Sequence, residues 1–126
     1  MRCDPRCCAS PVQMCMCAYA AALPVSTFSA LSLAREGVPL RLVMAIPCPE
    51  QAKYYSARDR ALYERLCAAA ECVTLSDRYT RYCMLERNRY MVDRAGYLIC
   101  YLRESRGGTY QTRAYAEMKN RCILDL

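Results

Sequence analysis

The chain has 126 residues, of which 55% are apolar by a broad count, so it can form one domain with a core but not two. This apolar content argues against a wholly disordered chain. The net charge of +6 suits an anionic ligand, but the basic residues form no block, which argues against nucleic acid as a partner. No apolar run is long enough to cross a bilayer, so we expect no membrane partner.

Eleven cysteines and the absence of histidine limit the metal and redox chemistry of the chain. Five cysteines near the N-terminus lack the paired Cys-x2-Cys spacing of usual zinc sites, so we expect no metal and no cofactor: Cys3, Cys7, Cys8, Cys15 and Cys17. The other six lie in periodic segments, and we interpret them as reduced residues in or near the core of a cytoplasmic protein: Cys48, Cys67, Cys72, Cys83, Cys100 and Cys122.

The N-terminal part of the chain has the weakest structural signals. Residues 1–20 form an irregular or atypical segment, within which residues 12–19 could be a strand or a short helix. Ser26 or Thr27 can then cap a helix that Gly37 ends.

Three elements follow with clearer signals. Residues 40–46 are nearly all apolar, which predicts a strand covered on both faces. Ser56 is a good N-cap for a helix over residues 57–70. Residues 71–75 predict a short strand.

The C-terminal third continues the alternation of helices and strands. Residues 81–94 predict a charged helix, and residues 97–102 predict a short buried strand. Thr109 can cap a further helix that runs to about residue 120, and residues 122–126 form a closing strand.

Strands that alternate with helices predict an α/β fold for residues 21–126, with a Rossmann-like, mostly parallel sheet of about five strands and helices on both faces. In such sheets, ligands bind beyond the carboxyl ends of the strands. The loops after residues 46, 75 and 102 would therefore face one crevice.

A strand, a glycine turn and a helix start together favour an anion site over Gly107, Gly108 and Thr109. Backbone N–H groups at a helix start lack intrahelical acceptors, and glycine lets a phosphate come close. The alternative is an ordinary turn with a threonine cap.

Arg87 and Arg89 are two residues apart on a helix, so we expect only one of them to reach the crevice, where the Asn88 side chain could also form a hydrogen bond. Pairing on a solvated helix face, with Glu86 or Asp93, is the alternative for the arginine.

Tyrosines near this crevice could stack on a base or bond a ribose. The candidates are Tyr55, Tyr79, Tyr82 and Tyr110. For each of them, packing as core filler in a chain without tryptophan is the alternative.

The run from Tyr79 to Asp93, with the strand at residues 99–102 and the turn Arg106-Gly107-Gly108-Thr109, resembles the YpsA-type SLOG family. This family comprises small bacterial Rossmann-like proteins related to the Lonely Guy phosphoribohydrolases and to DprA. Membership would imply a nucleotide or a nucleotide-derived ligand, with Arg87 on the ligand side. Such domains often pair through helix faces, which leaves a homo-oligomer open.

The chain departs from the family pattern in its first half. The family's Thr-Gly-His-Arg strand is missing or rebuilt, so the chain resembles an N-terminally truncated or diverged member. Pro24 stands where a phosphate-binding glycine is expected, and proline has no N–H to donate.

Three functions follow as hypotheses. The first is a sensor or regulator that binds a nucleotide without catalysis, so that no residue is catalytic. The second is a nucleotide N-glycosidase of the phosphoribohydrolase type, but no carboxylate follows the glycine turn until Glu117. The third is a structural or partner-binding protein whose ligand site has decayed.

Overall fold

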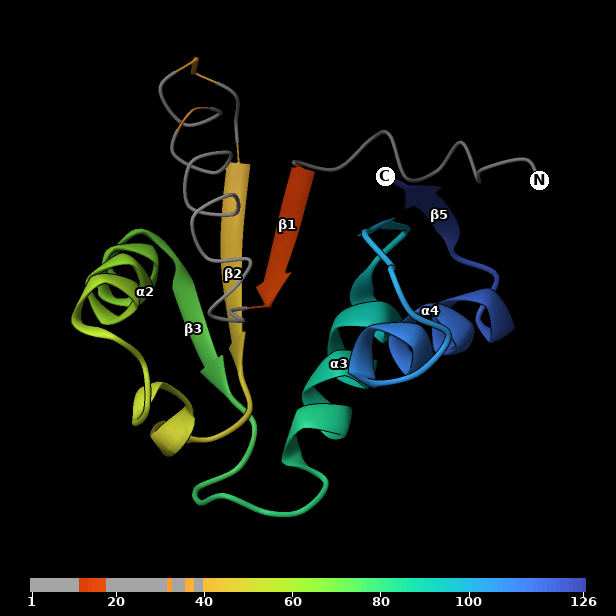
Figure 1. The fold of residues 1–126 in the computed structure, drawn as a ribbon. Coiled ribbons are helices and arrows are strands. Elements are labelled where there is room, and N and C mark those ends of the chain that lie inside the picture. The colour runs from red at the N-terminus through yellow and green to blue at the C-terminus, as the bar shows by residue number, and fades with distance from the viewer. Residues whose placement is uncertain (1–11, 18–31, 33–35, 38–39) are drawn as a thin grey trace.

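The computed structural model of the chain describes residues 12–17, 32, 36–37 and 40–126 (Figure 1). The helix predicted between Ser26 and Gly37 falls largely outside these residues, as do Cys3, Cys7 and Cys8. The strands of the described part are β1 (Val12–Cys17), β2 (Leu40–Ile46), β3 (Glu71–Thr74), β4 (Tyr97–Cys100) and β5 (Cys122–Asp125). Its helices longer than one turn are α2 (Ala57–Ala69), α3 (Cys83–Arg94) and α4 (Gly108–Met118).

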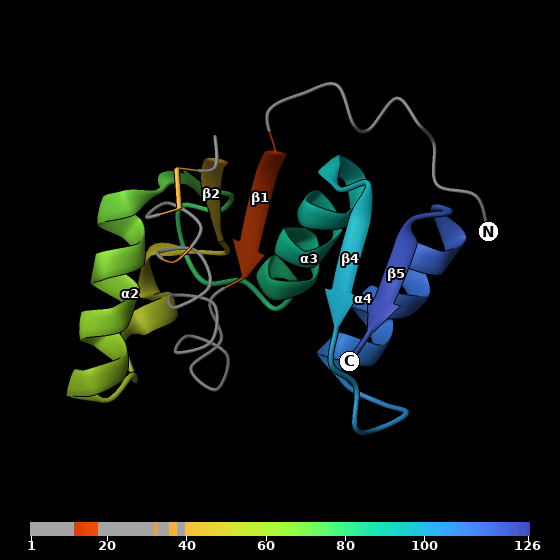
Figure 2. The same ribbon diagram turned by 90° about the horizontal axis from the view of Figure 1, so that it is seen from above.

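The fold is α/β and Rossmann-like, and the strand pairings among the described residues are parallel, in agreement with the predicted mostly parallel sheet. The described strands form two small sheets rather than one, with the orders β1-β2-β3 and β4-β5. In Figure 2, β1 and β4 are the inner strands of the two sheets. Pairing between them would give the order 3-2-1-4-5 of a doubly wound fold. Instead, α3 contacts β1, β2 and α4, so this helix links the two halves.

Most predicted elements are present with shorter ends. The strand β2 has the predicted bounds, and the segment that could have been strand or helix is the strand β1. Ser56 caps α2 as predicted, because its Oγ accepts a hydrogen bond from the Asp59 N–H at 3.1 Å.

The prediction that Thr109 caps the last helix is wrong. The N-cap of α4 is Gly107, which has φ +91° and supplies no side-chain bond, and Thr109 lies within the first turn. A positive φ of this kind suits glycine because it has no Cβ. The helix therefore begins two residues earlier than predicted.

The core of the first sheet is built on β2, whose residues from Val43 to Ile46 are all buried. Side chains alternate between faces along a strand, so burial of consecutive residues confirms the prediction that both faces are covered. Met44 and Ile46 pack against Leu66 of α2, which is only 1% exposed.

The second sheet is covered by α4 on one face. Arg113 of α4 donates to both carboxylate oxygens of Asp125 on β5, at 2.9 and 2.7 Å, and also pairs with Glu117. The strand β4 is half buried rather than buried as predicted, because Cys100 points inward while Ile99 is 62% exposed.

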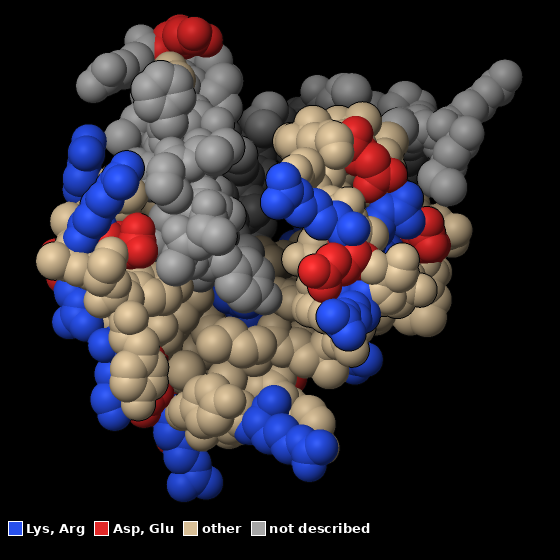
Figure 3. Space-filling view, viewed as in Figure 1, with Lys and Arg blue, Asp and Glu red and all other residues tan. Residues whose placement is uncertain are grey.

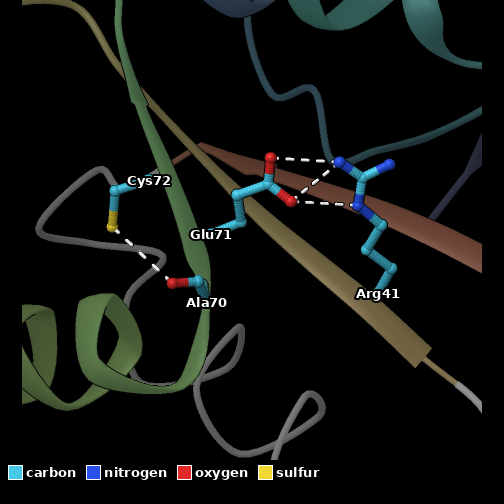
Figure 4. A network of polar contacts seen from close by, with 4 residues as sticks. All are labelled: Arg41, Ala70, Glu71 and Cys72. Atoms are coloured by element: carbon cyan, nitrogen blue, oxygen red, sulfur yellow. Dashed lines mark hydrogen bonds and ion pairs between the residues drawn. The ribbon is translucent and has the colours of Figure 1, made fainter.

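An ion pair also joins β2 to β3 at the edge opposite the loops (Figure 4). The Arg41 guanidinium donates to both carboxylate oxygens of Glu71, at distances of 2.8 to 3.0 Å. Both side chains are exposed, so we assign this pair at most about 1 kcal/mol.

Replacing Leu66 with alanine tests the core of the first sheet. We expect Leu66→Ala to lower the free energy of unfolding by about 2 to 5 kcal/mol, because it leaves a cavity against Met44 and Ile46. Urea unfolding followed by circular dichroism measures this change. Leu124→Ala on the half-exposed face of β5 is the matched control, and an equal loss in both variants would contradict this core.

The link between α4 and β5 predicts a pH dependence. Hydrogen bonding from Arg113 holds the pKa of Asp125 below its usual range. A lowered pKa in the folded state means that the carboxylate stabilises the fold above its unfolded pKa of about 3.9, and that this contribution is lost as the pH falls below that value.

We therefore expect Arg113→Gln to be less stable than the wild type near neutral pH, with a difference that shrinks as the pH falls below about 4. Urea unfolding over a pH series measures it. Arg94→Gln serves as control, because Arg94 bonds only a backbone carbonyl and stacks on Tyr90. A difference for Arg113→Gln that does not change with pH would contradict the assignment.

Candidate functional site

A groove of about 290 Å³ lies between α3 and α4, close to the start of α4. Its α3 side is built by residues spaced three and four apart, which share one face of a helix. The lining residues are Leu85, Asn88 and Arg89 of α3 and Gln111, Thr112 and Tyr115 of α4.

Arg87, which precedes Asn88 in α3, does not line the groove and is completely buried. Its Nε donates a hydrogen bond of 2.8 Å to Oδ1 of Asn88, and its Nη2 lies 3.9 Å from the sulfur of Met84. A guanidinium can only donate, so the atom of Asn88 that faces it must be the oxygen. Arg87 thereby fixes the orientation of the Asn88 side-chain amide.

With its oxygen held by Arg87, the Asn88 amide presents its nitrogen on the other side. Asn88 is 6% exposed and lines the groove, and no described residue accepts a hydrogen bond from Nδ2. Solvent still reaches Nδ2, so a ligand acceptor can replace water there, and this donor is a candidate for ligand contact.

The remaining groove residues are positioned by contacts with their own neighbours. The guanidinium of Arg89 lies over the Tyr115 ring, 5.3 Å from its centroid, and the Tyr115 hydroxyl donates to Asp93 at 2.8 Å. Thr112 Oγ1 donates to the Gly108 carbonyl at 2.7 Å. These bonds hold the tyrosine and the threonine in place.

The groove is consequently rich in donors, with the Asn88 amide and the Arg89 guanidinium on one wall. The first turn of α4 does not line the groove but precedes the turn that does; its backbone N–H groups lack intrahelical acceptors, and its N-cap Gly107 provides no side-chain cap. Such a set suits an anion that offers only acceptors, such as a phosphate or a carboxylate.

The structure brings only some of the predicted site residues together. Asn88 lines the groove, and Arg87 lies buried behind it. Gly107, Gly108 and Thr109 form the exposed start of α4, next to the turn that carries the groove residues. The structure places Tyr79 and Tyr110 elsewhere: both are exposed, and neither lines the groove.

Sequence reasoning missed the role of the second turn of α4. Gln111, Thr112 and Tyr115 enter the groove because α4 packs against α3, and their spacing of one, three and four is the helical signal that could have found them. The sequence also led us to expect Arg87 on the ligand side of the crevice, whereas Arg89 is the arginine that lines the groove.

A second hollow of about 340 Å³ follows β2, at the edge where the loops after β2 and β3 meet. It mixes both charges, Lys53 and Arg60 with Glu50 and Glu64. Arg60 already donates to the carbonyls of Ala52 and Lys53, both at 3.0 Å. This hollow is therefore less suited to an anion than the groove between α3 and α4.

None of the helices in the described residues is long and apolar enough to span a membrane. The same part of the chain holds no group of three or more metal-ligating side chains. No protein-family model matches the chain, and no curated protein matches it either.

Proposed function

We propose that the chain is a nucleotide-binding domain of the YpsA-type SLOG kind, which senses or regulates rather than catalyses. A nucleotide or a nucleotide-derived ligand would bind in the groove between α3 and α4. The observation that carries this proposal is the Asn88 amide, which the buried Arg87 turns so that its donor faces the groove.

Phosphate recognition is supported by the donors at one end of the groove. Asn88 Nδ2, Arg89 and the first N–H groups of α4 would share the phosphate oxygens. The Arg89 guanidinium on the Tyr115 ring offers a flat surface on which a base can stack. The groove volume is near the lower end for small-molecule sites, which favours a mononucleotide.

The arrangement of carboxylates supports binding without catalysis. Glycoside hydrolysis needs a carboxylate at the bond that breaks, and none lines the groove among the described residues. Glu104, on the loop before α4, pairs with Arg106 and is exposed. Glu117 pairs with Arg113 on α4. The N-glycosidase therefore ranks below the sensor as a proposal.

Charge and cysteine chemistry bear on the partners and the compartment. On the face shown in Figure 3, basic side chains intermingle with acidic ones and form no continuous basic track, so we do not favour nucleic acid. The thiols of Cys48, Cys67, Cys72, Cys83 and Cys100 are free, which supports a reducing, cytoplasmic environment. A homo-oligomer stays part of the proposal because domains of the SLOG kind often pair through helix faces.

A thermal-shift experiment with adenosine monophosphate tests the binding proposal. At about a hundred times its dissociation constant, a ligand specific for the folded state adds about 2.7 kcal/mol of stability, so we expect a clear rise in Tm. Adenosine and inorganic phosphate separately should give smaller rises. No rise with any mononucleotide would instead favour a decayed site, and release of free adenine would favour the N-glycosidase.

Two arginines of α3 provide a matched pair of variants for the same assay. Arg89→Ala should weaken the binding of adenosine monophosphate by about tenfold or more, through loss of a charged hydrogen bond. Arg94→Ala should leave binding unchanged, because Arg94 also stacks on a tyrosine but lies outside the groove. Equal effects of both substitutions would show that only the net charge matters.

A further inference from the structure

Two thiols meet where α2 ends and β3 begins. Cys67 lies in the last turn of α2, and Cys72 is the second residue of β3. The sulfur of Cys72 points back at the helix end and lies 4.0 Å from the carbonyl oxygen of Ala70 (Figure 4). It also lies 3.6 Å from the carbonyl oxygen of Cys67. The Cys72 sulfur therefore lies against the residue that carries the second thiol.

We propose that Cys67 and Cys72 form a reversible dithiol switch that hydroperoxides oxidise to a disulfide. The Cys72 sulfur already lies 3.6 Å from the Cys67 carbonyl oxygen, and only four residues separate the two cysteines, so rotation of the two side chains would bring the sulfurs together. This inference is independent of the nucleotide site.

The exposure of the two thiols indicates which of them is oxidised first. Cys72 is exposed, whereas Cys67 is partly buried among Tyr63 and the core of α2. Burial and the neighbouring Cys72 raise the pKa of the Cys67 thiol to about 11, so this thiol is the weaker nucleophile at neutral pH. Cys72 is therefore the thiol that meets the oxidant first, and Cys67 is the resolving thiol.

The chemistry balances with hydrogen peroxide as the oxidant. The Cys72 thiolate attacks one peroxide oxygen, the O–O bond breaks, and Cys72 sulfenic acid and hydroxide form. The Cys67 sulfur then attacks the Cys72 sulfur, the S–O bond breaks, and the oxygen leaves as water with the proton of Cys67. Two thiols are thus oxidised by two electrons, and one peroxide is reduced to two waters.

A second thiol pair in the same chain is a natural control. Burial and, after it, the neighbouring Cys83 at the start of α3 raise the pKa of Cys48, which follows β2. Both residues are almost completely buried, at 1% and 0% exposure. Burial keeps an oxidant away from this pair and raises the pKa of Cys48, so proximity alone should not produce a bridge there.

Peptide mapping of the folded full chain after brief treatment with hydrogen peroxide tests the proposal. Trypsin cleaves after Arg65 and Arg78, so both switch thiols fall in the peptide 66–78, whereas Cys48 and Cys83 fall in separate peptides. We expect the peptide 66–78 to lose the mass of two hydrogen atoms and to resist alkylation until dithiothreitol is added. The peptides that carry Cys48 and Cys83 should be alkylated normally.

Single substitutions separate the proposed bridge from general oxidation. In Cys72→Ser, Cys67 should remain open to alkylation after peroxide, while Cys122→Ser should leave the bridge intact. The proposal is overturned if the wild-type peptide 66–78 still takes two alkyl groups after peroxide. It is equally overturned if Cys48 and Cys83 become bridged first, because exposure would then not decide reactivity.

Discussion

The hydrogen bond from the buried Arg87 to Asn88 is the interaction on which the site depends. A guanidinium stays charged and can only donate, so its burial requires an acceptor nearby. Asn88 Oδ1 supplies one at 2.8 Å, and the amide cannot turn over without placing two donors face to face. A single buried contact therefore decides that a donor, and not an acceptor, lines the groove.

The same helix carries the architecture of the domain. Because β1 and β4 do not pair, the two small sheets are joined through α3, which contacts β1 and β2 on one side and α4 on the other. The groove lies at the second of these contacts. Binding there would act on the helix that holds the two halves together, which is a suitable position for a sensor.

The sequence predicted the fold class and the order of elements because each depends on local patterns. The apolar run of β2 and the Ser56 cap of α2 act over a few residues, and both are confirmed. The split into two sheets depends on whether β1 and β4 pair with each other. This pairing joins strands far apart in the sequence, so local patterns do not predict it. Likewise, the exposure of Ile99 follows from helices covering only one face of β4–β5 in the described residues.

Only those parts of the site that depend on local sequence patterns could be predicted. Asn88 and the glycine turn were recognised from the residues next to them in the sequence. Which arginine faces the groove depends instead on how α3 is rotated against α4. The glycines at residues 107 and 108 marked the turn before α4, although the predicted cap at Thr109 is wrong. The groove residues one turn later come from packing between helices, which the linear motif does not contain.

Asn88→Asp tests the central claim most directly. The substitution keeps an oxygen for the buried Arg87 but replaces the donor that faces the groove with a second carboxylate oxygen, which repels an anion. Calorimetric titration with adenosine monophosphate should show affinity reduced by about tenfold or more, equivalent to at least about 1.4 kcal/mol, with unfolding stability retained. Unchanged affinity in a variant of full stability would contradict the account.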